Sequence, residues 1–252
     1  MLKSSLKLDY RAVVELLHDS PDLCRVIKLA RVPHYTTLQK SAARLLKMPI
    51  IEKLLTSSLR RHSPRRKRVK VVAIDSTGLE SHHCSRYFVK HRSRIENLWQ
   101  TTNDRRFPKL GIVCDSSTHL ILAVQLSRGP SPDVDQLKEL VLNARFVTPI
   151  GSRLADAGYD SESNHQYCRD VLHIKTIIPA AHGRPTSKPA KGNYRRLMQT
   201  RFNRKQYGQR WQAETVMSMI KRRQGDSTAG RTYHSRRRDL MLMAITHNFM
   251  IL

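Results

Sequence analysis

From residue 69 onward the chain alternates apolar runs of strand length with segments of helical periodicity, and this alternation restricts the folds open to it. Strands are predicted over residues 69–74, 109–114, 119–125, 152–156 and 174–178. Helices are predicted between them, over residues 132–141 and 161–172. Strands interleaved with crossover helices indicate an α/β sheet, and the tight turn at residues 115–118 makes that sheet partly antiparallel.

The first 59 residues show helical patterns instead. Ser20 followed by Pro21 is typical of a helix start, because proline suits the first helical position. The apolar face of this helix is predicted to comprise Leu23, Val26, Ile27 and Ala30. Thr36 is predicted to cap a second helix with the apolar residues Leu38, Ala42, Leu45 and Leu46. Two helices joined by a short turn are typical of a helix-turn-helix, whose second helix enters the major groove, and also of a plain helical hairpin.

Residues 60–70 contain seven cations, no acid and a proline, which predicts an exposed connector. Such a run is commonly a solvated linker. In a chain this basic it is also expected to contact DNA phosphates without regard to sequence, through Arg65, Arg66, Lys67 and Arg68. The predicted division is a helical region over 1–59, a basic linker over 60–70 and a sheet-containing domain over 71–252.

The charge balance indicates a polyanionic partner. Lys and Arg number 46 against 20 Asp and Glu, which gives a formal net charge of +26. Such an excess repels itself in the folded state, and a phosphate backbone that releases counterions on binding compensates it. RNA-binding proteins, chromatin-like proteins and nucleases share this signature. The 39% hydrophobic content still provides a substantial core at this length, so a disordered chain is excluded.

Cysteines and apolar segments exclude several other classes. Four cysteines lie far apart without a C-x-x-C pair, which argues against a zinc module and a disulfide framework. The amino-terminal residues lack the apolar core of a signal peptide. The apolar segment 240–252 is too short to span a bilayer and predicts a packed terminal helix. We therefore expect a cytoplasmic protein, associated with the nucleoid, without a membrane partner.

An unusual arrangement of charge lies in residues 207–221, which have helical spacing throughout. At about 100° per residue, one narrow stripe would hold a phenol, two cations and a carboxylate: Tyr207, Arg210, Glu214 and Lys221. The opposite stripe would be apolar, with Ala213, Val216 and Ile220. Spacing alone fits a salt-bridged surface helix as well as a functional one.

Three carboxylates are candidates for holding metal. Asp75 and Asp156 end predicted strands, and ligands gather at the carboxyl ends of strands in open α/β sheets. A helix packed over that edge would add Glu214. Such oxygen ligands favour magnesium or manganese, and two ions about 3.5–4 Å apart activate a nucleophile and stabilise the leaving oxygen at phosphorus. Taken singly, Asp75 also fits a turn or cap, and Asp160 is an alternative to Asp156.

Together these residues resemble the DDE transposases of bacterial and archaeal insertion sequences, in the branch with the Y-x2-R-x3-E-x6-K signature. Residues 207–221 match that spacing in full, residues 75–77 resemble the first catalytic block and residues 156–160 the second. The start around residues 32–38 is also similar. The resemblance implies a ribonuclease H-like mixed sheet with flanking helices, preceded by a small helical amino-terminal region. It also implies metal-dependent cleavage at transposon ends, followed by strand transfer from a 3′ hydroxyl.

The resemblance also assigns roles. Asp75, Asp156 and Glu214 would be the catalytic residues and would hold two divalent ions, Mg²⁺ or Mn²⁺. Double-stranded DNA, both transposon ends and target, would be contacted by Arg210, Lys221 and, through its hydroxyl or ring, Tyr207. Trp211 would stack on a displaced base, or else pack against the sheet. Because two ends are held together in transposition, we expect a homodimer on DNA.

The chain departs from some relatives in two ways. Only 58 positions separate Asp156 from Glu214, which leaves little room for a large strand-rich insertion. The helical pattern also begins almost at residue 1, so a segment for end recognition is expected to be reduced or missing. Two other functions stay open on the sequence: a DNA-binding protein that does not cut, and a ribonuclease H-like nuclease that cuts without joining.

Overall fold

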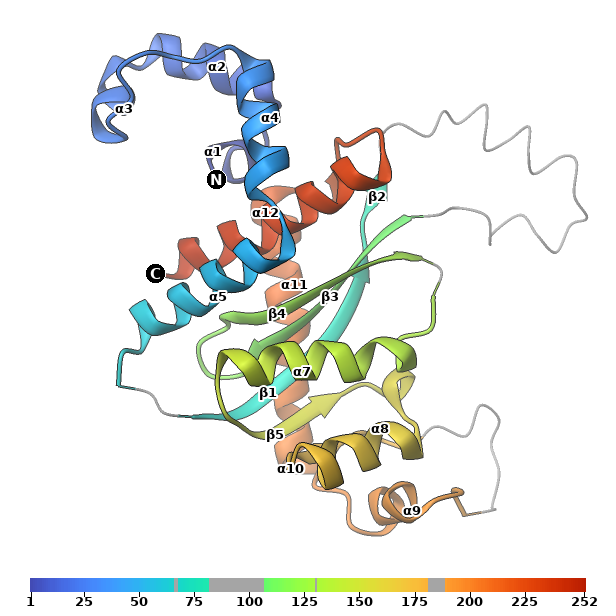
Figure 1. Ribbon diagram of the computed structural model, residues 1–252. Coiled ribbons are helices and arrows are strands. Elements are labelled where there is room, and N and C mark those ends of the chain that lie inside the picture. The colour runs from blue at the N-terminus through green and yellow to red at the C-terminus, as the bar shows by residue number, and fades with distance from the viewer. Residues whose placement is uncertain (66–67, 82–106, 130, 181–188) are drawn as a thin grey trace, which may run out of the picture.

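The computed structural model describes residues 1–65, 68–81, 107–129, 131–180 and 189–252, and a five-stranded mixed sheet forms its centre (Figure 1). The strand order is β4-β3-β1-β5-β6. These strands are β1 (Val69–Gly78), β3 (Phe107–Asp115), β4 (Ile121–Gly129), β5 (Ile150–Ala155) and β6 (Lys175–Ile177). β1, β3 and β4 pair antiparallel, whereas β5 and β6 continue the sheet from β1 in parallel. The expected α/β class is confirmed, and the topology is ribonuclease H-like.

The hairpin between β3 and β4 forms where the turn residues predict it. The carboxylate of Asp115 accepts hydrogen bonds from the backbone N–H and the hydroxyl of Ser117, at 3.0 and 2.9 Å, and from the hydroxyl of Thr118 at 2.8 Å. His119 has a φ of 61°, so the turn extends beyond the expected segment and β4 begins at Ile121 rather than at residue 119. The sequence did not predict the short parallel pair β2 (Glu80–Ser81) and β7 (Ser227–Thr228), because two residues carry no periodicity.

Helices cover both faces of the sheet (Figure 1). On one face lie α5 (Met48–His62), α11 (Trp211–Gln224) and α12 (Tyr233–Ile251), which bury apolar residues against Ala73, Leu110 and Ile112. On the other lie η1 (Val134–Gln136), α7 (Leu137–Val147), α8 (Glu162–Gln166) and the π-helical turn η3 (Tyr167–Val171). The expected helix over 132–141 thus begins as a 3₁₀ turn at Val134, and the expected helix over 161–172 ends in a π-turn.

The remaining helical elements are short. They are α1 (Leu2–Ser5), α2 (Tyr10–Asp19), α3 (Pro21–Val26), α4 (Tyr35–Leu45), η2 (Ala157–Tyr159), α9 (Asn193–Thr200), α10 (Arg204–Tyr207) and η4 (Gly208–Arg210). No helix in the described ranges has the length and apolar character needed to cross a membrane.

The amino-terminal helices form, but two details of their prediction are wrong. The apolar face predicted for the first helix is largely solvent-exposed: α3 ends at Val26, which is 79% exposed, and contains no buried residue. A helix of six residues has fewer than two turns, so it offers too few apolar side chains on one face to pack against a core. The cap of α4 is His34, whose Nδ1 accepts the Thr36 N–H, because the helix begins at Tyr35 and includes Thr36.

The basic segment at 60–70 is only partly a connector. Arg60, Arg61 and His62 form the last turn of α5, where cations interact favourably with the helix dipole, and β1 begins at Val69. α5 buries Ile51 and Leu55 in the same core as α12 and the sheet. The division of the chain into three regions stays a prediction, but α5 packs with the sheet.

A single side chain of α12 ties this helix to the sheet edge. Asn248 is fully buried, and its Oδ1 accepts the Ile121 N–H at 2.8 Å. Its Nδ2 donates to the Ile121 carbonyl and to the Ser58 hydroxyl, each at 2.8 Å. Both backbone groups of Ile121, at the start of the edge strand β4, are thereby satisfied without a neighbouring strand.

We expect Asn248→Ala to lower the free energy of unfolding by about 3 kcal/mol, because it strands a buried N–H and a buried carbonyl of Ile121. Urea unfolding followed by circular dichroism measures this. Asn143→Ala is the matched control, since the Asn143 side chain on α7 makes no hydrogen bond to another described residue. Equal midpoints for the two variants would show that Asn248 does not hold the strand.

Candidate active site

Two acids lie side by side where the parallel pairing of β1 with β5 ends. β1 itself continues to Gly78, so Asp75 lies inside this strand, and the prediction that it ends the strand is wrong. In the register of β1 with β5, Ile74 is opposite Ala155, so Asp75 and Asp156 occupy the next position on each strand. Adjacent strands lie about 4.8 Å apart, which brings the two backbones as close as a sheet permits. Each carboxylate accepts the N–H of the following residue, Asp75 from Ser76 at 2.8 Å and Asp156 from Ala157 at 2.7 Å. The strand pairing thus brings together two of the predicted catalytic residues.

The signature segment crosses the sheet at this point, but not as one helix. Residues 207–221 are split between the end of α10, the 3₁₀ turn η4 and α11, which begins at Trp211. Gly208 is a poor helix former, and 3₁₀ turns commonly precede α-helices. η4 lies against β1 and β5. The Gln206 side chain anchors this segment by donating to the Ser152 hydroxyl on β5 at 2.6 Å.

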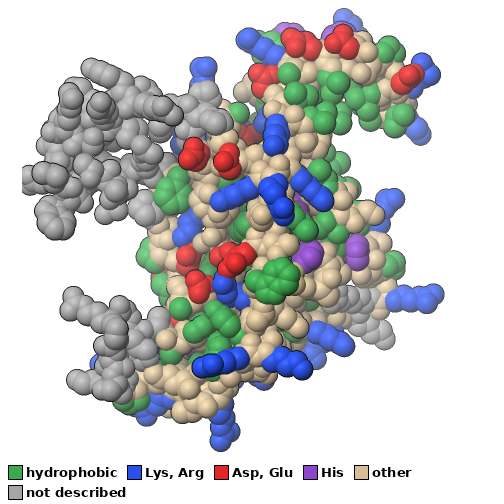
Figure 2. Space-filling view, turned by 180° about the vertical axis from the view of Figure 1, so that it is seen from behind, with side chains coloured by type: hydrophobic (Ala, Val, Ile, Leu, Met, Phe, Trp, Pro, Cys, Tyr) green, Lys and Arg blue, Asp and Glu red, His purple; other side chains and the backbone are tan. Residues whose placement is uncertain are grey.

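Arg210 and Glu214 form an ion pair beside the two aspartates. The Arg210 guanidinium donates a charge-assisted hydrogen bond to the Glu214 carboxylate one turn further along the chain. Figure 2 views this side of the sheet and shows acidic side chains gathered in the middle of the face, with basic side chains around them. The apolar back of the helix is confirmed, since Ala213, Val216 and Ile220 are buried against the sheet. An ordinary surface helix would not place its ion pair over two adjacent acids of the sheet.

The charge of Asp75 depends on its surroundings. Burial raises the pKa of this carboxyl to about 6, and the negative charges of Glu214 and Asp156 add to the rise. The Ser76 hydrogen bond and the Arg210 charge act in the opposite direction without cancelling it. These interactions show that Asp75, Asp156, Glu214 and Arg210 share one electrostatic environment.

The other predicted DNA contacts lie along the same segment. The Tyr207 ring is half-buried against Phe202, with ring centres 4.9 Å apart, and Arg210 lies 5.9 Å from its centre. Trp211 is 56% exposed, so it does not pack inside the sheet. Lys221 lies two turns beyond Glu214 on α11, about 10 Å away along the axis. Burial raises the pKa of the Tyr207 hydroxyl, which therefore stays protonated and able to donate.

The four predicted linker contacts precede β1 and are distant in sequence from Tyr207, Arg210, Trp211 and Lys221: they are Arg65, Arg66, Lys67 and Arg68. Arg65 and Arg68 are exposed, and Arg68 precedes the first residue of β1. Arg66 and Lys67 lie outside the described residues.

Asp160 is distinguished from Asp156 by burial. The Asp160 side chain is fully buried, receives a hydrogen bond from Arg195 at 2.8 Å and lies 3.4 Å from His165. These contacts connect the end of η2 to α8 and α9 and stabilise their packing. Asp156 is exposed at the strand end. The structure therefore supports the choice of Asp156 over Asp160.

A fourth acid near the site was missed by the sequence argument. Asp133 accepts a hydrogen bond from the Ser76 hydroxyl at 2.6 Å and pairs with Lys109 at 2.7 Å. Burial, and then the charge of Asp133, raise the pKa of the Tyr159 hydroxyl, which is enclosed in the same place. Strand direction could have indicated Asp133. β4 runs in the same direction as β1 and β5, so an acid that follows β4 lies at the same edge of the sheet. Asp133 holds the part of β1 that carries Asp75.

The donor set suits a hard divalent cation. Carboxylate oxygens are the ligands that magnesium and manganese prefer, and the raised pKa of Asp75 marks negative charge that a cation would neutralise. Within the described ranges, no three His, Cys, Asp or Glu side chains already converge closely enough to hold one ion. Glu214 is instead turned to Arg210. The chemistry of Asp75, Asp156 and Glu214 fits a divalent metal.

The fold and the adjacent acids place the protein among ribonuclease H-like proteins built around a carboxylate centre. Residues 66–249, nearly three quarters of the chain, match the family described as transposase DDE domain, and the chain belongs to that family. A comparison with curated proteins found no match. Transposases of this family act on DNA and generally use divalent metal ions.

Asp75 makes the stability of the metal-free protein depend on pH. A carboxyl whose pKa rises on folding from near 4 to about 6 destabilises the folded chain once it is ionised, by about 3 kcal/mol. Above pH 6, Asp75→Asn should therefore raise the free energy of unfolding by that amount. Below pH 4 the carboxyl is protonated in both states, and the difference should vanish.

Urea unfolding in EDTA at pH 4 and pH 8 measures the effect. Asp135→Asn, at an exposed position on η1, serves as the control. A gap of the same size at both pH values would mean that the ionisation of Asp75 is not its cause.

Proposed function

We propose that the chain catalyses metal-dependent cleavage at transposon ends and transfers the freed 3′ hydroxyl to target DNA. The observation that carries this proposal is the placement of Asp75 and Asp156 side by side where the pairing of β1 with β5 ends, with the Arg210–Glu214 pair in the same electrostatic environment. Family membership supports the reaction class, and the geometry supports the choice of residues.

Asp75, Asp156 and Glu214 are the proposed catalytic residues and would hold two Mg²⁺ or Mn²⁺ ions. When bound, these ions supply activation of the attacking hydroxyl or water and stabilisation of the leaving oxygen. The protein positions the acids through the β1–β5 pairing and through the hydrogen bonds of Asp75 and Asp156 to the N–H groups that follow them. The Ser76–Asp133–Lys109 contacts fix this part of β1 from the other face of the sheet.

DNA phosphates are proposed to contact Arg210, Lys221 and the Tyr207 hydroxyl, with Trp211 stacking on a displaced base. The exposure of Trp211 supports stacking over the alternative of packing in the sheet. A phosphate at Arg210 competes with Glu214 for the same guanidinium. Phosphate binding would thereby free Glu214 for metal, which links substrate binding to assembly of the carboxylate centre.

The wider organisation follows from the substrate. The basic residues Arg65, Arg66, Lys67 and Arg68 are proposed to track phosphates between a helical amino-terminal region and the catalytic domain. α2 packs on both α3 and α4, and α3 and α4 are proposed as the two helices of a helix-turn-helix. Because two ends are held together, a homodimer on DNA is proposed, and the proposed location is the cytoplasm, at the nucleoid.

We expect Glu214→Gln, Asp75→Asn and Asp156→Asn each to lower cleavage more than a hundredfold, because even outer contacts of metal ligands are worth about 10- to 100-fold. DNA affinity should stay within about twofold, since every cation is kept. The assay is cutting of labelled duplexes that carry the terminal repeats flanking the gene, with Mg²⁺ or Mn²⁺.

Glu139→Gln, at an exposed acid on α7, is the matched control and should cut normally. Any of the three variants that retains activity loses its place among the catalytic residues. A paired-end substrate then separates a transposase, which joins, from a nuclease, which only cuts. Equal DNA binding by the native chain and Glu214→Gln, with no cutting by either, would favour a DNA-binding protein.

Arg210→Ala should weaken DNA binding and lower the salt slope of log K by about one, because one phosphate contact is lost. Fluorescence anisotropy between 50 and 200 mM salt measures the slope. Arg145→Ala, at an exposed arginine on α7 across the sheet, should leave it unchanged. A slope that Arg210→Ala does not alter would confine Arg210 to its ion pair with Glu214.

A further inference from the structure

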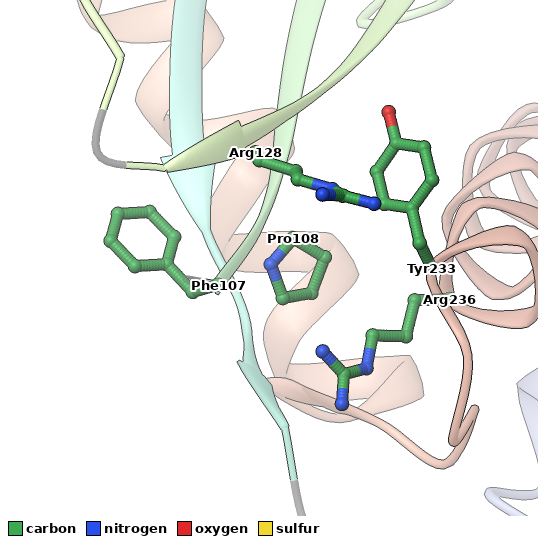
Figure 3. Close-up of a pocket in the computed structure, with 5 residues that line it drawn as sticks. All are labelled: Phe107, Pro108, Arg128, Tyr233 and Arg236. Carbon is green, nitrogen blue, oxygen red and sulfur yellow. The ribbon is translucent and has the colours of Figure 1, made fainter. Parts of the chain in front are cut away.

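A pocket of about 220 Å³ lies between the end of the β3–β4 hairpin and the start of α12 (Figure 3). Its lining residues are Phe107, Pro108, Arg128, Tyr233 and Arg236. Two of the five carry guanidinium groups, and none carries a negative charge. This pocket takes no part in the carboxylate centre described above.

Both arginines are held in place before any ligand arrives. The Arg128 guanidinium lies over the Tyr233 ring, 4.0 Å from its centre, as Figure 3 shows. Arg236 donates from Nε to the Gly230 carbonyl at 2.9 Å, which leaves its two terminal nitrogens for another acceptor. Ordering long side chains before binding reduces the entropy lost on association.

Position 230 requires glycine for this arrangement. A Cβ there would lie 2.6 Å from the Arg236 backbone nitrogen and 2.6 Å from the Ser235 hydroxyl. The Gly230 N–H also donates to the Asp239 carboxylate at 3.0 Å. The close approach of this backbone to the first turn of α12 is what presents the Gly230 carbonyl to Arg236.

Neither arginine of the pocket has an acidic partner in the part of the chain that the structure describes. The pocket also lies at the amino end of a 19-residue helix, which adds partial positive charge. Two unpaired, pre-ordered guanidiniums are a site for a phosphate group.

The pocket shares its sheet face with Asp75. Directly opposed residues of antiparallel strands point to one face, and Asp75 is opposite Ile112 while Pro108 is opposite Arg128. Ile112 and Pro108 are four residues apart on β3, so they share that face and lie about 13 Å apart. The spacing of about 3.4 Å between phosphates on one strand of B-form DNA is measured along the helix axis, and neighbouring phosphates lie about 7 Å apart through space, so this span covers about two nucleotides.

We propose that the Arg128–Tyr233–Arg236 pocket binds a backbone phosphate of the DNA strand about two nucleotides from the phosphate at the carboxylate centre. This inference rests on the proposed function for the identity of the polymer, and it adds a second contact that fixes the strand's direction across the sheet. A duplex held at two points on one strand cannot rotate about the cleaved bond.

The test uses the full chain with Glu214→Gln, so that binding is measured without cutting. Arg128→Gln with Arg236→Gln should lower the salt slope for terminal-repeat duplex by about 0.9, since one phosphate contact is lost. Arg145→Gln is the control and should not change it. A slope unchanged by the double variant overturns the site, and circular dichroism confirms that each variant is folded.

The phosphate that binds the pocket can be located by replacing one backbone phosphate of the DNA at a time with a neutral methylphosphonate. The affinity of the parent chain should fall when the neutral group lies about two nucleotides from the cleaved bond, whereas the affinity of the double variant should not change at that position. Identical scanning patterns for both chains overturn the proposal. Deoxyadenosine monophosphate at constant ionic strength should not compete with duplex; micromolar competition would mean that the pocket binds free nucleotide instead.

These outcomes are separable from failure of the proposed function. A native chain that does not cut, combined with a lowered slope in the double variant, leaves the phosphate site standing in a DNA-binding protein. A native chain that cuts, combined with an unchanged slope, removes the phosphate site alone.

Discussion

The parallel pairing of β1 with β5 is the constraint on which the rest of the structure depends. It places two carboxylates at neighbouring positions, where they repel each other and where burial already disfavours the charge on Asp75. Basic residues lie on both faces of the sheet here. On the face that α11 covers, the Arg210 guanidinium on η4 partly offsets the repulsion, and on the opposite face Lys109 pairs with Asp133. The site is a strained arrangement of like charges that the fold maintains against its own electrostatics.

Much of this arrangement was predictable because it is encoded locally. The apolar runs that form β1, β3, β4 and β5 are long enough to show their period, and the turn at Asp115 contains its own hydrogen-bonding groups. Asp75, Asp156 and Glu214 could be chosen because acids are few in so basic a chain. Family resemblance then supplied what spacing alone left open, namely which of many polar residues belong to one centre.

What the sequence could not provide depends on contacts between distant segments. The signature segment changes from α-helix to 3₁₀ turn at η4, where it packs against two strands. Asp133 lies near Asp75 because β4 runs in the same direction as β1, and this direction is a property of the folded sheet. The exposed apolar residues of α3 show the opposite failure: a correct helical pattern does not ensure a partner surface. Likewise, the arginine pocket unites residues over a hundred positions apart, which no local pattern records.

The hydrogen bonds between Asn248 and the Ile121 backbone also determine when the edge of β4 can be covered during synthesis. Ile121 emerges 127 residues before the side chain that satisfies its backbone groups. Until then β4 presents an open edge, the kind of surface through which partly folded chains pair with one another. The sheet edge is therefore covered only after α12 has been synthesised, and the interval before that is when a strongly basic nascent protein is most exposed to misassembly.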